Sequence, residues 1–151
     1  MKTLRDPAAH AEIRARLARL TPDAPRQWGR MNAHQMICHL ADSFRGVLGH
    51  KTIRPLPTPV PRSFFKWVAL RMPMHWPHGV KTVPEVDQEI GGTRPAEFAG
   101  DLRDLQALLA RFVENPRAIA PRHPIFGPMS ETDWMRWGYL HVDHHLRQFG
   151  N

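Results

Sequence analysis

Three histidines lie close together near the C-terminus, at His141, His144 and His145. On an α-helix, His141 and His145 are one turn apart, so both imidazoles project from the same face. Two imidazoles with this spacing can bind one divalent metal ion through their ring nitrogens. The same spacing suits two histidines that form hydrogen bonds in a core or at an interface, so the pair alone leaves both interpretations open. A metal site needs at least one more protein ligand.

The segment around these histidines has a clear helix start. Ser130 is a typical N-cap residue, and Glu131 and Asp133 follow in the first turn, where the helix dipole favours negative charge. Gly150 can end the helix. The sequence therefore predicts a helix from Ser130 to about Gly150.

One face of this predicted helix gathers the residues of interest. At about 100° per residue, an arc of roughly 80° contains Trp134, Gly138, His141, His145 and Gln148. We expect this arc to face the core, with Gly138 leaving room above the imidazoles and Asp143 facing solvent. His144 lies about 60° from His141 and could support the site or contact a neighbouring helix.

The second predicted helix offers two candidates for a third ligand, His34 and His39. Asn32 is its expected N-cap, and its apolar positions form one broad stripe that ends near residues 46–49. His34 and His39 flank opposite sides of this stripe. Either imidazole could turn inward between two helices, so the pattern by itself does not choose between them.

Two further helices complete the expected core. The first begins at the Asp6 cap and ends before Thr21. The other runs from about Pro95 to about Asn115, with the apolar seam of a helical bundle at Phe98, Leu102, Leu105, Leu109 and Phe112. No alternating strand pattern of useful length is present. The sequence predicts an all-α four-helix bundle that forms a single domain over residues 1–151.

A proline-rich crossover of about residues 50–94 separates the second and third of these helices. Its alternating prolines, at positions 55, 57, 59 and 61, predict extended chain. One short helix is expected over residues 64–72, with Ser63 as its cap. The aromatic residues here, interleaved with Lys66 and Arg71, favour a hydrophobic lid over the bundle end, with His75 and His78 as surface or lid residues. Binding to an anionic membrane or a partner is the alternative.

Composition excludes several classes of protein. The 151 residues contain 42% hydrophobic residues and a single cysteine, which suits a folded domain in the reducing cytoplasm without a disulfide. No signal peptide is expected, and no stretch approaches the roughly 20 apolar residues of a membrane span. The net charge is +7, but the arginines are scattered and no nucleic-acid motif is present, so we expect no nucleic-acid partner.

Several motifs resemble one known family. The segment Met36–Asp42 is similar to the second-helix motif of the DinB/YfiT-like metalloenzyme superfamily, and His141–Gln148 is similar to its last-helix motif. Segments Thr82–Gln88 and His123–Gly127 resemble a subgroup catalogued as a domain of unknown function. The resemblance covers about residues 8–150.

This resemblance implies a four-helix bundle, often dimeric, with a three-histidine metal site. Carried over residue by residue, the ligands are His39, His141 and His145, which selects His39 over His34. The resemblance implies nickel or zinc as the metal and a low-molecular-weight thiol as a possible co-substrate. A metal-dependent transferase, isomerase or hydrolase that acts on a small molecule is then the expected function. The alternative is a non-catalytic bundle that binds a small ligand or protein partner, with the histidines structural.

Four further residues are expected around this site. His144 and Gln148 could orient the ligands, while Arg147 could bind a carboxylate or a thiol cofactor. His123 lies in a Pro/Gly-rich loop, where it stabilises the turn or lines the pocket. Cys38 precedes His39 but points about 100° away on the helix, so we expect a buried small apolar side chain there.

Overall fold

The computed structural model describes residues 1–57, 61–80 and 82–151. These residues form the α-helices α1 (Pro7–Ala18), α2 (Ala33–Val47), α3 (Arg62–Arg71), α4 (Phe98–Glu114) and α5 (Glu131–Arg147). Two short 3₁₀-helices, η1 (Pro84–Val86) and η2 (Pro116–Ala118), and a hairpin of β1 (Arg122–His123) and β2 (Gly127–Pro128) lie in the connections. The predicted all-α class is confirmed.

The caps predicted for three helices are confirmed. Asp6 accepts a hydrogen bond from the backbone of Ala8, and Asn32 forms a reciprocal capping box with Gln35. Ser130 forms the same arrangement with Asp133, the third residue of α5. Each cap satisfies backbone N–H groups that the helix itself leaves without partners, which explains why local sequence predicts these starts well.

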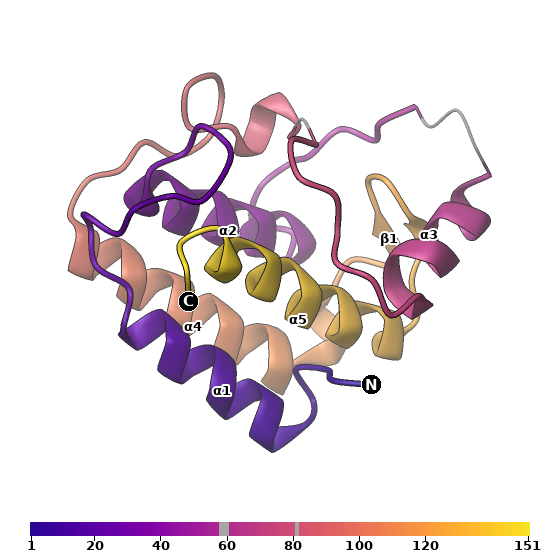
Figure 1. The fold of residues 1–151 in the computed structure, drawn as a ribbon. Helices are drawn as coiled ribbons and strands as arrows, with labels where there is room; N and C mark the ends of the chain where they lie inside the picture. Colours follow the sequence, from indigo (N-terminus) through magenta and orange to yellow (C-terminus); the bar gives the residue numbers. More distant parts are fainter. Residues whose placement is uncertain (58–60, 81) are drawn as a thin grey trace.

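Helices α1, α2, α4 and α5 pack side by side as a bundle (Figure 1). α2 lies against α4, and α1 lies against α5. Where the helices meet, the rings of Phe44, Phe112 and Trp137 contact one another edge to face, with the Phe44 and Phe112 centroids 5.1 Å apart. The bundle therefore closes around an aromatic core that holds α2 and α5 at a fixed separation.

The expected role of Gly138 is wrong. A Cβ atom at this position would lie 2.7 Å from Cδ1 of Leu4 and 3.0 Å from Cε1 of Phe112. Gly138 therefore allows the N-terminal segment and α4 to approach α5 closely, and it does not make space above the imidazoles.

The connections differ from the prediction in three places. α3 begins at Arg62, with Pro61 at its cap position, so Ser63 is not the cap. α4 begins at Phe98, where the Glu97 side chain accepts hydrogen bonds from two backbone N–H groups, rather than near Pro95. The hairpin was not expected, because strands of two residues are too short to show alternation. Of the crossover prolines, Pro59 lies outside the described residues.

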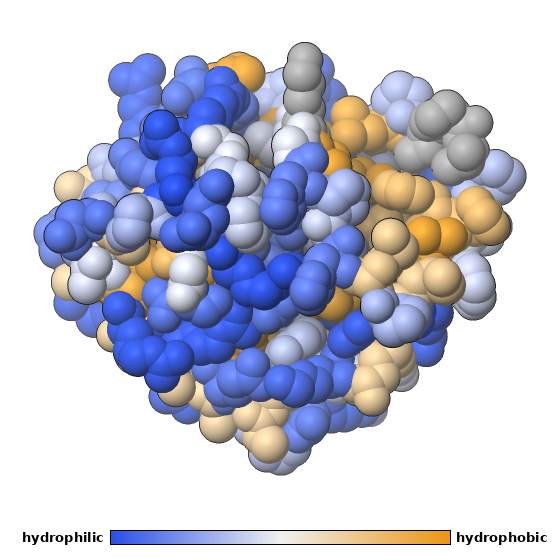
Figure 2. Space-filling model, viewed as in Figure 1, coloured by the Kyte–Doolittle hydropathy of each residue, from blue (hydrophilic) through white to orange (hydrophobic). Residues whose placement is uncertain are grey.

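α3 and the hairpin lie at one end of the bundle, where hydrophobic side chains gather on the surface (Figures 1 and 2). Phe64 and Trp67 are 60% and 55% exposed. Lys66 and Arg71 are the cations that would bind an anionic membrane. Both donate to the carboxylate of Asp133 on α5, so both are already paired within the protein. None of the helices in the described ranges is long and apolar enough to cross a membrane.

Candidate metal centre

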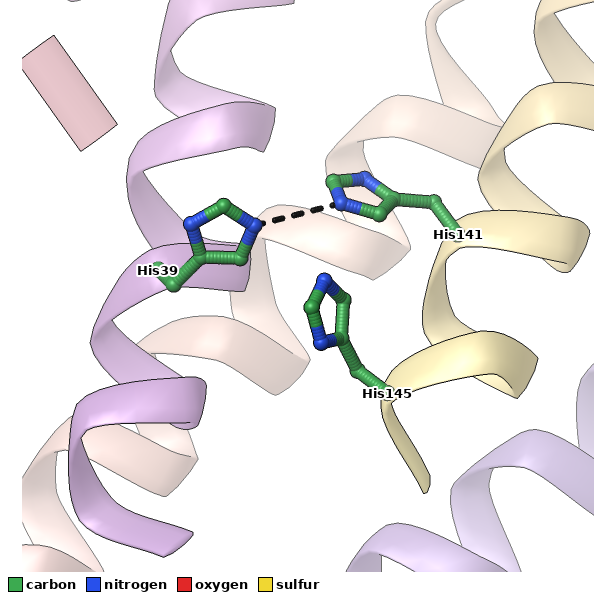
Figure 3. A group of neighbouring side chains, drawn as sticks. All are labelled: His39, His141 and His145. Carbon is green, nitrogen blue, oxygen red and sulfur yellow. Dashed lines mark hydrogen bonds between the residues drawn. The ribbon is translucent and has the colours of Figure 1, made fainter. Parts of the chain in front are cut away.

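Three imidazoles from two helices point toward one another between α2 and α5 (Figure 3). They belong to His39, His141 and His145, and one ring nitrogen of each lies within 4.8 Å of the other two. The Nε2 atoms of His39 and His141 are 3.3 Å apart. Two imidazole nitrogens that bind one tetrahedral zinc ion at ordinary bond lengths are separated by about 3.3 Å. The spacing of the cluster therefore fits a bound divalent ion.

His34 points away from this cluster. Its Nε2 lies 2.7 Å from a carboxylate oxygen of Asp101 on α4. Because α2 packs between α4 and α5, the two sides of its apolar stripe face different helices. Packing thus directs His39 toward the histidines of α5 and His34 toward α4.

Carbonyl oxygens determine the tautomers of two imidazoles in the cluster. Nδ1 of His39 lies 2.8 Å from the carbonyl oxygen of Val86, in η1, and Nδ1 of His145 lies 3.0 Å from Oε1 of Gln148. The Gln148 amide is itself oriented, because its Nε2 donates to the carbonyl oxygen of Trp28. A carbonyl oxygen only accepts hydrogen bonds, so both Nδ1 atoms carry the proton and both Nε2 atoms present a lone pair.

Burial keeps the cluster uncharged. His39 and His145 are 4% and 8% exposed, and His141 is half-buried. Burial lowers the pKa of His39, and it lowers the pKa of His141 and His145 well below the ordinary value, with a further contribution from neighbouring imidazoles. All three are therefore neutral at pH 7, which is the protonation state that a metal ion requires of imidazole.

The third imidazole differs from the other two. Within the described part of the chain, Nδ1 of His141 is buried without a hydrogen-bond partner. A buried polar atom without a partner costs about 1–3 kcal/mol. Nδ1 of His144 and the amide of Gln88 are likewise buried without a partner in the described part of the chain, so such atoms are not confined to the three-histidine cluster.

Aromatic side chains form a wall beside the half-buried ligand. The ring centroids of Trp137 and Trp76 lie 4.9 Å and 6.1 Å from that of His141. Trp76, from the crossover, also lies 6.1 Å from His144, whose ring is 5.9 Å from Trp28. Two residues of the segment expected to form a lid are thus placed beside the histidines: His78, whose ring is 6.2 Å from that of His144, and Trp76. The role of Trp76 was missed because a tryptophan in an irregular segment has no periodicity to predict where it packs.

The other residues considered in the sequence analysis lie at the edge of the three-histidine cluster or away from it. His144 lies at the edge of the cluster, where burial and the nearby Arg147 lower its pKa to about 4. Arg147 donates to Asp143, which also accepts from Arg16 of α1 at 2.7 Å. The prediction that Asp143 faces solvent is therefore wrong, because its carboxylate joins α1 to α5. His75 is exposed.

Two groups that orient the cluster were not found from the sequence. The carbonyl oxygens of Val86 and Trp28 belong to the backbone, and every residue type has such a group. Side-chain chemistry therefore carries no signal for them.

His123 stabilises the hairpin rather than the cluster. Its Nδ1 accepts hydrogen bonds from the backbone N–H groups of Ile125 and Phe126, at 3.1 Å and 3.3 Å. Its ring stacks on Phe126 and is 8% exposed. Burial lowers its pKa to about 3. Of the two expected roles, the structure shows stabilisation of the turn.

This buried histidine predicts how stability depends on pH. Below its ordinary pKa of 6.5, His123 binds a proton in the unfolded chain but not in the fold, down to about pH 3. Stability therefore decreases as the pH falls through this window, by up to about 1.4 kcal/mol per pH unit for this one group. In His123→Asn protein, the side-chain oxygen can still accept from the turn but does not titrate. We expect the free energy of unfolding of the His123→Asn protein to fall less steeply with acid than that of the wild type, by up to about 1.4 kcal/mol per pH unit.

Urea unfolding of both proteins from about pH 7 to about pH 4 measures the two slopes. The other titrating groups are common to both proteins and cancel in the comparison. Equal slopes would contradict the prediction.

The fold and the site define a class: a helical bundle with a buried three-histidine cluster that could hold a metal ion. The chain belongs to the family described as Protein of unknown function (DUF1569), whose model matches residues 3–151. No curated protein and no solved structure matches the chain.

Proposed function

We propose that His39, His141 and His145 bind one divalent metal ion at the centre of a metal-dependent enzyme of the DinB/YfiT-like type. One observation carries this proposal. Carbonyl oxygens hold the proton of His39 and of His145 on Nδ1, so both Nε2 lone pairs are available where the three rings converge. Hydrogen bonds of this kind, from the second nitrogen of a histidine, are typical of imidazoles that bind metal ions.

The side chains around the cluster have distinct roles in this proposal. The three neutral imidazoles hold the ion, while Gln148 and the carbonyl oxygen of Val86 keep two of them oriented. Trp76 and Trp137 limit the access of water on the side of His141. A divalent ion bound by three neutral ligands would act as a Lewis acid and would lower the pKa of a thiol or a water molecule.

The finer proposal is a transferase, isomerase or hydrolase that acts on a small molecule with a low-molecular-weight thiol. The motifs of α2 and α5 support it by their similarity to the DinB/YfiT-like superfamily. Imidazole ligands suit zinc and nickel, which we propose as the metals. By the same resemblance we propose a homodimer, in which each chain contributes its own three histidines. The single cysteine supports a location in the reducing cytoplasm.

Metal analysis by mass spectrometry tests the site. Compared with wild-type protein, we expect His39→Ala, His141→Ala and His145→Ala each to lose about one equivalent of zinc or nickel per chain. His50→Ala is the matched control, because His50 is exposed and outside the cluster. Folded variants that retain the wild-type metal content, or wild-type protein that takes up neither metal, would overturn the proposal.

A second measurement separates an enzyme from a non-catalytic metal protein. A small anion such as azide, added to cobalt-loaded Cys38→Ala protein, should change the visible spectrum if a coordination position of the three-histidine site is open to exchange. An unchanged spectrum at saturating azide would support the non-catalytic alternative.

The residue that orients His145 can be tested separately. Gln148→Ala removes the hydrogen-bond acceptor of Nδ1 and leaves all three ligands in place. We expect a loss of about 10- to 100-fold in zinc affinity, because ring orientation and ligand basicity depend on such contacts. Competition with a chelator measures the affinity.

Arg147→Ala is the control for this variant, because the adjacent Arg147 contacts Asp143 instead of the cluster. Circular dichroism verifies that both variants fold. An affinity of Gln148→Ala equal to that of Arg147→Ala would contradict the assigned role.

A further inference from the structure

A second group of metal-ligating side chains lies between α2 and α4, outside the three-histidine cluster. It consists of His34 and Cys38, one turn apart on α2, and Asp101 on α4. One ligand atom of each residue lies within 4.8 Å of the other two. The proposed function uses none of these residues.

The distances in this second cluster are close to those of a zinc site. Sγ of Cys38 is 3.6 Å from Oδ2 of Asp101, and a thiolate and a carboxylate oxygen on one tetrahedral zinc ion are also about 3.6 Å apart. Nε2 of His34 is 2.7 Å from the same oxygen and would have to move to about 3.3 Å. Side-chain rotation within this partly exposed pair can supply a shift of that size.

Neighbouring groups already position the three side chains. The backbone N–H of Ala96 donates to Asp101, and the ring of Phe98 contacts His34 edge to face at 5.4 Å. Cys38 is 2% exposed, whereas the side chains of His34 and Asp101 are 19% and 20% exposed. The thiol is thus buried behind two accessible ligands, which leaves a route for an ion and for a water molecule as fourth ligand.

We propose that His34, Cys38 and Asp101 form a second metal site that binds a zinc-like divalent ion and links α2 to α4. The Cys38 thiol must lose its proton to bind an ion, because the thiolate is the metal ligand. Binding releases that proton to solvent and leaves a thiolate on the ion. The thiolate and the carboxylate together carry two negative charges, which offset the charge of the ion. This ligand set differs from the neutral three-histidine cluster, whose ion would remain electrophilic.

Cobalt substitution distinguishes the two sites, because only the second contains sulfur. We expect protein loaded with Co²⁺ in the presence of a phosphine reductant to show a thiolate-to-cobalt charge-transfer band in the near ultraviolet. The band should be lost in Cys38→Ser and strongly reduced in His34→Ala and Asp101→Asn. It should persist in His141→Ala, which disrupts the three-histidine cluster but leaves Cys38 in place.

Either of two results with cobalt would overturn this proposal without affecting the proposed function. One is cobalt-loaded wild-type protein without a thiolate band. The other is a band that survives in folded Cys38→Ser, since the chain has a single cysteine. Alkylation of Cys38 in wild-type protein gives a measurement that needs no variant: bound zinc should slow the reaction. An unchanged alkylation rate at saturating zinc would show that the three side chains form only a hydrogen-bonded cluster.

Discussion

Zinc should stabilise this protein strongly through the three-histidine cluster. In Cys38→Ala protein, which lacks the thiol of the second cluster, free zinc at about 1,000 times the dissociation constant is expected to raise the free energy of unfolding by about 4 kcal/mol. The reason is that His39 lies on α2 and the other two ligands lie on α5, so the unfolded chain does not hold the three imidazoles together. Urea unfolding with zinc and with a chelator measures the difference.

The control for this experiment adds His141→Ala to the same protein. The double variant retains two imidazoles and should lose most of the stabilisation by zinc. His50→Ala, at an exposed position, should leave it unchanged. Equal stabilisation of the double variant would show that zinc acts elsewhere.

Loss of Asp42 should destabilise the fold by about 3–5 kcal/mol, the range for removal of one partner from a buried ion pair. The side chain of Asp42 is 0% exposed and accepts hydrogen bonds from Lys51 at 2.8 Å and Arg45 at 3.0 Å. The backbone N–H and the hydroxyl of Thr93 also donate to it, at 2.6 Å and 2.7 Å. Burial acts to raise the pKa of Asp42, but the hydrogen bonds from Lys51 and Thr93 hold the pKa below its ordinary value. Asp42→Ala removes this shared acceptor, and of these donors Lys51 retains the carbonyl oxygen of Gly91 at 3.3 Å.

This carboxylate also matters for the site, because it attaches both ends of the crossover to α2. Lys51 lies near the start of the crossover and Thr93 near its end, and Val86 between them orients His39. Asp104→Ala is the matched control, since Asp104 lies 3.7 Å from the same Arg45 but its side chain is 66% exposed. Urea unfolding should show little change for Asp104→Ala. A similar small change for Asp42→Ala would contradict the assignment.

Local chemistry explains which helix boundaries were predictable. Asp6, Asn32 and Ser130 cap their helices through groups within three residues, so the signal and the structure it produces are adjacent in the chain. The start of α4 was less predictable. Proline is common at the start of a helix, which is why Pro95 was expected there. The helix instead begins after Glu97, whose side chain accepts hydrogen bonds from the N–H groups of Ala99 and Gly100.

The cluster itself was predictable in part. The spacing of His141 and His145 places both on one face of a helix, whatever that helix packs against. The choice between His34 and His39 could not be made from the pattern, because the two flank opposite sides of one apolar stripe. It depended on the resemblance to a known family, and the structure directs His39 toward α5 because α4 covers the other side of α2.

The sequence by itself determined the helical class, three of the helix starts and the common face of two imidazoles, because these follow from interactions between residues close in the chain. Only the tertiary structure decided which histidine of α2 meets them, and which carbonyl oxygens hold their tautomers. It also placed Gly138 against Leu4 and Phe112 and joined His34, Cys38 and Asp101. These outcomes depend on contacts between helices far apart in the chain, which packing of the whole bundle selects and no local pattern encodes.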